Sequence, residues 1–131
     1  MIWNVASDYV YDHSFKHFQY IGWPDHGAPK STKSILALAK AVRKIVAAEK
    51  FNVKLLVHCA AGVGRTGTFI ALYQLMEILD EKVANHKLGN PLTPREENKD
   101  EELTIDIFNT VMELRKKRTE MVSYPEFSFL V

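Results

Sequence analysis

The sequence has only one cysteine, Cys59, among its 131 residues. A single cysteine excludes an internal disulfide, so the residue is either a small buried hydrophobe or a reactive thiol. Unpaired thiols are typical of proteins in a reducing compartment, which leads us to expect a cytoplasmic protein.

Charge of one sign and long hydrophobic runs are also lacking. The formal net charge is +1, which gives no reason to expect nucleic acid or an anionic membrane as a partner. The most apolar region, residues 35–48, contains Lys40, Arg43 and Lys44 and is too short to cross a bilayer. The first ten residues lack the pattern of a signal peptide. We therefore expect a soluble protein without a membrane span.

Internal repeats and low-complexity tracts are absent, and the length suits one domain, which we place at residues 1–131. Two short segments, residues 15–21 and 53–57, are predicted strands. The second, VKLLV, is apolar on both faces, as in the middle of a parallel sheet. Apolar residues recur at helical spacing in three further segments, residues 31–49, 65–82 and 103–118.

The order of helix, buried strand, glycine-rich loop and helix predicts an α/β layered fold with a central, mostly parallel sheet and flanking helices. Residues 83–101 are polar and contain two prolines, so we expect an exposed excursion there. A last helix is predicted to begin near Ser123, with Pro125 in its first turn.

The glycine-rich segment VHCAAGVGRTG, residues 57–67, has the features of an anion site. Where a strand gives way to glycines and opens a helix, backbone N–H groups converge and the helix N-terminus adds partial positive charge. Arg65 adds a guanidinium that can bind two phosphate oxygens at once. The same groups would stabilise a thiolate at Cys59 and lower its pKa. Attack of that thiolate on phosphorus would form a phosphocysteine.

Three other interpretations of the loop are weaker. Residues 62–67 match the G-x-G-x-x-G of dinucleotide sites, but those sites need a strand ending in an acidic residue about 20 positions on. Here that position, near Glu81, is at the end of a predicted helix. A Walker loop needs lysine after its last glycine, where this chain has Thr68. A structural turn with an inert cysteine leaves the neighbouring histidine and arginine unexplained.

The pattern His58-Cys59-x5-Arg65-Thr66-Gly67 resembles the phosphate-binding loop of the protein tyrosine phosphatases, which we place at residues 58–65. Trp-Pro-Asp-His-Gly, within residues 22–28, resembles the mobile general-acid loop of that family. The order and separation of the two motifs also fit. The phosphate-binding loop differs from the commonest family form mainly at Ala60, where serine is usual. Alanine keeps the backbone amide but loses a hydroxyl that would buttress the loop.

The resemblance implies hydrolysis of phosphotyrosine in proteins, without a metal or cofactor. Cys59 would be the nucleophile, and Asp25 would act as general acid and then as general base. Thr66 would donate a hydrogen bond to the departing thiolate, and His58 would order the loop and keep the cysteine acidic. The residues implied in substrate binding are Trp23, Ala60, Ala61, Gly62, Val63, Gly64 and Arg65.

The resemblance covers nearly all of this chain but only the C-terminal half of the family's catalytic domain, so the domain looks truncated. The Asn-Arg-Tyr-like phosphotyrosine-recognition loop is absent, as are the outer strands and N-terminal helices. Of the two glutamines that position water in the family, one is replaced by Ser123, and the other is deleted between Glu126 and Phe127.

Three hypotheses remain open: an active tyrosine phosphatase, a binding or decoy protein that turns phosphoprotein over poorly, and a truncated product without a stable fold. With few other strands available, we also expect residues 53–57 to leave an exposed apolar sheet edge that another chain could cover.

Overall fold

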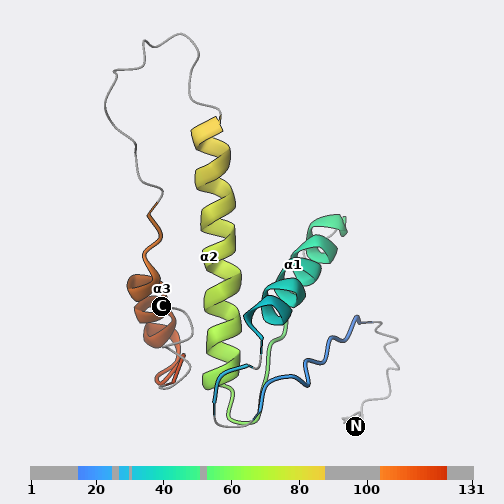
Figure 1. Cartoon of the computed structure of the whole chain (residues 1–131), viewed down its shortest axis with the longest axis vertical. Coiled ribbons are helices and arrows are strands. Elements are labelled where there is room, and N and C mark those ends of the chain that lie inside the picture. The colour runs from blue at the N-terminus through green and yellow to red at the C-terminus, as the bar shows by residue number, and fades with distance from the viewer. Residues whose placement is uncertain (1–14, 25–26, 30, 51–52, 88–103, 124–131) are drawn as a thin grey trace, which may run out of the picture.

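The computed structural model describes residues 15–24, 27–29, 31–50, 53–87 and 104–123. Within these ranges the chain forms three helices, α1 (Thr32–Ala48), α2 (Gly64–Lys87) and α3 (Ile107–Lys117). Helix α2 is the central element, and α1 and α3 pack against it on different sides (Figure 1). The segments that lead into α1 and α2 meet near the N-terminal end of α2 (Figure 1).

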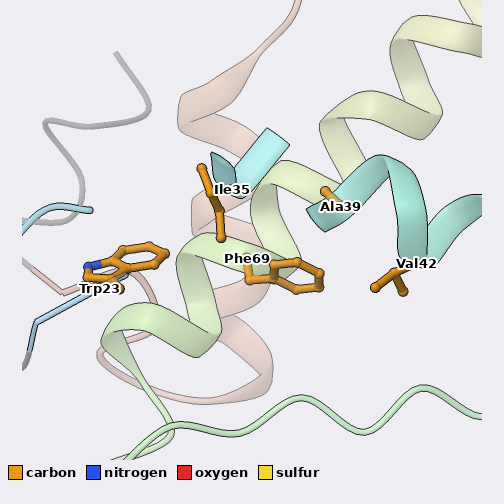
Figure 2. Packing of buried hydrophobic residues seen from close by; sticks show 5 residues of the cluster. All are labelled: Trp23, Ile35, Ala39, Val42 and Phe69. Atoms are coloured by element: carbon orange, nitrogen blue, oxygen red, sulfur yellow. The ribbon is translucent and has the colours of Figure 1, made fainter. Parts of the chain in front are cut away.

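Helix α1 is amphipathic, and its buried side faces α2. Ile35, Ala39 and Val42 are buried at spacings of four and three residues, which places them on one face of the helix. Together with Trp23 from the preceding loop and Phe69 from α2, they form the first hydrophobic core (Figure 2). This core fixes the loop that contains Trp23 beside the first turns of α2.

A polar contact reinforces the packing of α1 on α2. The guanidinium of Arg43 forms an ion pair with Asp80 at 2.8 Å and lies 5.8 Å from the ring centroid of Tyr73. A cation at that distance from an aromatic ring is attracted by the ring quadrupole.

The second core joins α2, α3 and the turn that follows α3. Its buried side chains are Ala71, Val111, Leu114, Met121 and Val122. Asp106 caps α3, because its carboxylate accepts a hydrogen bond from the backbone N–H of Asn109 at 2.8 Å. The two cores lie on either side of α2, so α2 organises the described part of the fold.

The predicted central parallel sheet is wrong: no strand is assigned in any of the described ranges. A strand needs a neighbour to pair its backbone N–H and C=O groups, and residues 15–21 and 53–57 do not pair with each other or with any other described segment. Leu55 and Leu56, which the sheet would have buried, are exposed, Leu56 by 86%. The apolar run at residues 53–57 would suit a sheet interior, but no described segment forms a sheet with it.

The three predicted helices are present with shifted ends. Helix α2 continues five residues past the predicted end at Lys82, because the chain offers no glycine or proline before Gly89. Residues 83–87 are therefore helical, and the rest of the predicted excursion lies outside the described residues. Helix α3 begins at Ile107 rather than near 103, since Asp106 caps it. The predicted helix beyond Ser123 also lies outside the described ranges.

None of the helices in the described ranges is both long and apolar enough to cross a membrane.

Candidate active site

The glycine-rich loop turns sharply into the N-terminus of α2. Gly62 has a φ of +73°, a left-handed conformation that costs glycine little because it has no Cβ. The carbonyl of Val63 then accepts hydrogen bonds from the backbone N–H of Gly67 at 3.0 Å and of Val122 at 3.1 Å. The loop is thus tied both to α2 and to the turn that follows α3.

Cys59 lies in this loop, with its sulfur close to the backbone of Gly62. The backbone N–H of Gly62 donates a hydrogen bond to its Sγ at 3.2 Å. Burial acts to raise the pKa of Cys59, but hydrogen bonds from the Thr66 side chain and from the backbone N–H groups of Thr66, Gly62 and Val63 outweigh it and lower the pKa. The donors favour the charged form of an acceptor, so the site stabilises a thiolate.

Thr66 presents an enclosed hydroxyl to the same sulfur. The residue is buried, and its Oγ1 makes no hydrogen bond of ordinary geometry with any group in the described part of the chain. The hydroxyl is nevertheless close enough to Cys59 to lower its pKa. A hydroxyl proton can rotate to suit its acceptor, so Thr66 can donate to a thiolate at Cys59.

Arg65 connects the glycine-rich loop to the predicted general-acid loop. Its Nη1 donates a hydrogen bond to the carbonyl of Trp23 at 3.4 Å. The indole N–H of Trp23 in turn donates to the carbonyl of Gly27 at 2.8 Å, and the ring is buried in the first core. Two segments 42 positions apart in sequence are therefore brought together. Asp25 lies between Trp23 and Gly27 in sequence, and outside the described residues.

The remaining predicted site residues differ in their exposure. Ala60 and Ala61 are exposed, Gly62 and Val63 are half-buried, and Gly64 is buried. His58 is exposed and makes no hydrogen bond or ion pair that involves another described residue. No group of three potential metal ligands lies together in the ranges that the structure describes.

Sequence reasoning missed two arginines at the end of α3. Arg115 donates from Nε to the carbonyl of Met121 at 3.0 Å and from Nη2 to the carbonyl of Val122 at 2.9 Å. Arg118 donates from Nη2 to the carbonyl of Ala61, inside the glycine-rich loop, at 3.1 Å. Arg115 lies in the last turn of α3 and Arg118 directly after it, with two lysines between them. Nothing in this sequence distinguishes a loop support from a solvated basic helix end.

Backbone strain marks the turn that Arg115 holds. Glu120 and Val122 have φ values of 64° and 57°. A positive φ is unfavourable for any residue with a Cβ, and a β-branched valine adopts it only where its surroundings enforce it. Here the two bonds from Arg115 and the bond from Val122 to Val63 supply that constraint.

Comparison with known proteins connects the chain with one family. The family model described as protein-tyrosine phosphatase matches residues 4–131. The chain is 38% identical over 107 residues to receptor-type tyrosine-protein phosphatase V of Rattus norvegicus, covering 82% of this chain and 5% of that protein. It is 36% identical over 106 residues to tyrosine-protein phosphatase 2 of Dictyostelium discoideum, covering 81% of this chain and 24% of that protein.

A third relative, tyrosine-protein phosphatase 3 of Schizosaccharomyces pombe, is 42% identical over 72 residues, which cover 54% of this chain and 23% of the relative. The chain therefore spans a quarter or less of the length of each of these curated relatives. No solved structure matches it. Since the family model extends over almost the whole sequence, the chain belongs to the protein-tyrosine phosphatase family.

Proposed function

We propose that this chain carries the nucleophile and the phosphate-binding loop for hydrolysis of phosphotyrosine in proteins. The observation that carries the proposal is the hydrogen bond from the Gly62 N–H to Cys59 Sγ at the start of α2. A cysteine held in this way has a lowered pKa and faces the place where backbone amides and Arg65 would bind an anion.

In the first chemical step, the thiolate of Cys59 attacks phosphorus. A P–S bond forms and the bond from phosphorus to the phenolic oxygen breaks. Asp25 transfers its proton to the departing oxygen. The amides of residues 60–65 and the guanidinium of Arg65 stabilise the equatorial oxygens, because these donors are already oriented when charge develops.

In the second step, water attacks the phosphocysteine and releases inorganic phosphate. Asp25, now a carboxylate, accepts a proton from the water as the P–S bond breaks. Thr66 donates a hydrogen bond to the departing thiolate of Cys59, a role supported by the burial of its hydroxyl beside that sulfur. Trp23 supports the general-acid loop, since its carbonyl contacts Arg65 and its indole closes the turn to Gly27.

The second candidate function is binding of phosphoprotein with little turnover. It is favoured by Ser123, which occupies a position where the family has a water-positioning glutamine. Hydrolysis requires a reduced thiol at Cys59, so we expect the protein to act in a reducing compartment such as the cytoplasm.

Steady-state hydrolysis of para-nitrophenyl phosphate and of a phosphotyrosine peptide by the whole chain tests the proposal. We expect release of phosphate by the unaltered protein and none by Cys59→Ser, which keeps the size of the residue but lacks a nucleophilic thiolate. Phosphate binding without hydrolysis by the unaltered protein would support the binding function instead. Turnover that survives in Cys59→Ser would disprove the assignment of the nucleophile.

A further inference from the structure

The C-terminal end of α3 lies behind the phosphate-binding loop, on the side of the loop carbonyls. Arg118 follows α3 directly, and its backbone N–H is anchored on the carbonyl of Leu114 at 3.0 Å. Leu114 belongs to the second core, so the base of the Arg118 side chain is fixed relative to α2. From there its guanidinium reaches the carbonyl of Ala61, 57 positions earlier in the sequence.

The peptide unit between Ala61 and Gly62 has two partners on opposite sides. Its carbonyl oxygen accepts from Arg118 at 3.1 Å, and its N–H donates to Cys59 Sγ at 3.2 Å. In a planar trans peptide the C=O and N–H bonds point in opposite directions. Holding the carbonyl outward therefore directs the N–H inward, toward the sulfur and the anion site.

We propose that Arg118 is a positioning residue that fixes the Ala61–Gly62 peptide so that the Gly62 N–H stays directed at Cys59 and at the bound phosphoryl group. The inference rests on the proposed function of this loop. Arg118 contacts neither substrate nor the reacting atoms; it acts through the peptide that does.

This loop needs an external support because it has few means of holding itself. Gly62 adopts a positive φ and has no side chain, so it places little steric limit on rotation of the peptide before it. Ala60 and Ala61 provide no side-chain hydrogen bonds. A Cβ built on Gly62 would lie 3.4 Å from both terminal nitrogens of Arg118, so the guanidinium also lies against the loop backbone at this residue.

The charge of Arg118 acts in the same direction as its hydrogen bond. A cation at the carbonyl end polarises the peptide, which strengthens the N–H as a donor to a thiolate or phosphate at the other end. Because Arg118 is exposed, solvent screens its direct field at Cys59, and the orientation of the peptide is the larger effect.

Alkylation of Cys59 by iodoacetate across pH tests the role of Arg118 without any need for turnover. The whole chain is compared with Arg118→Ala, Arg118→Lys and the control Lys117→Ala. Lys117 is exposed, carries the same charge, and makes no hydrogen bond or ion pair with any residue in the described ranges. The control therefore removes a charge from the same helix end while leaving the loop support in place.

We expect Arg118→Ala to shift the alkylation midpoint to higher pH and to weaken protection of Cys59 by inorganic phosphate about tenfold, less than the 10²–10³-fold loss from deleting an oxyanion donor. Arg118→Lys retains a donor and should restore most of the protection. Lys117→Ala should match the unaltered chain. A folded Arg118→Ala variant with an unchanged midpoint and unchanged protection would overturn the inference.

If circular dichroism shows that Arg118→Ala is unfolded, Arg118→Met decides the question. Methionine keeps an unbranched stem that can pack but has neither the donor nor the charge, so we expect the midpoint to shift toward that of a free cysteine, and an unchanged midpoint would count against the inference. An unaltered chain with a lowered midpoint but no phosphatase activity would refute the proposed function alone. An unaltered chain that titrates like a free thiol would refute both.

Discussion

The backbone nitrogen of Val122 lies 2.3 Å from the point that a Cβ on Gly67 would occupy. The first turn of α2 and the strained turn after α3 thus meet backbone to backbone, with no side chain between them. The same contact permits the hydrogen bond from Val122 to Val63. Glycine at position 67 is therefore required by close approach of two backbones, which the helical pattern around it does not reveal.

Replacement of this glycine is the most direct test of that contact. We expect Gly67→Ala to lower the free energy of unfolding by about 1–3 kcal/mol or more, because a clash with backbone cannot be relieved by a change of rotamer. Urea unfolding followed by circular dichroism measures the loss. The control Gln74→Ala, at an exposed position of the same helix, should change stability by no more than about 0.5 kcal/mol. Equal stabilities for the two variants would contradict the proposed contact.

The lowered pKa of Cys59 predicts a pH-dependent contribution to stability. Although burial opposes it, the Thr66, Gly62 and Val63 hydrogen bonds depress the folded-state pKa. Between that pKa and the unfolded value of about 8.5, the unfolded chain binds more protons, so stability rises with pH. The unfolding free energy of the unaltered chain minus that of Cys59→Ser should therefore increase as pH rises across this window and level off above the unfolded pKa. As pH falls through the folded pKa of Cys59, this stabilising contribution should be lost. A difference that is constant with pH would refute the depressed pKa.

Asp25 is expected to act as the general acid for the first chemical step. Asp25→Ala should lower turnover of a phosphotyrosine peptide by roughly 10²–10⁴-fold. A substrate with an acidic phenol needs less help from a proton donor, so its turnover should fall less. Phosphate protection of Cys59 should survive, since Asp25 is not part of the phosphate-binding loop. Equal losses on both substrates would argue against the role.

The sequence predicted the helices better than the architecture. The helical periodicity that includes Ile35 and Val42 reflects contacts with one neighbouring helix, so a short stretch of sequence was enough to predict it. The apolar pattern of residues 53–57 indicates only that these residues would suit a sheet interior. The partners of a strand are distant in sequence, so this pattern alone does not show whether they exist. The hydrogen bonds from Arg115 and Arg118 to the backbone could not be predicted either. Every residue has a backbone carbonyl, so the residue type at the accepting position gives no sign that an arginine binds there.

The exposed apolar segment has a consequence for solubility. Leu55 is 45% exposed and Leu56 is 86% exposed, next to each other in a segment without a pairing partner among the described residues. We expect concentration-dependent self-association driven by this surface. Leu56→Lys should reduce it in sedimentation velocity, whereas Lys54→Leu in the same segment should increase it. A chain that stays monomeric at all concentrations, with both variants unchanged, would show that this surface is not adhesive.

The slow step of catalysis is expected to be hydrolysis of the phosphocysteine. Formation of the intermediate needs Cys59, the loop and Asp25, all of which the sequence retains. Its hydrolysis also needs a water held in line, and a misplacement of about 1 Å can cost 10²-fold in rate. Ser123 is half-buried and directly follows Val122, whose N–H is bonded to the loop at Val63. Its side chain is shorter than that of glutamine.

Rapid-mixing kinetics should therefore show a burst of about one phenolate per active site followed by slow steady-state release, as expected when a covalent intermediate accumulates. Acid quench and mass spectrometry should detect phosphate on Cys59. Ser123→Gln should raise the steady-state rate without changing the burst amplitude, because it supplies the longer amide only to the second step, and Ser123→Ala should not raise it. Linear release from the first turnover, with no trapped phosphocysteine, would place the slow step before the intermediate and remove the basis for assigning Ser123 to water positioning.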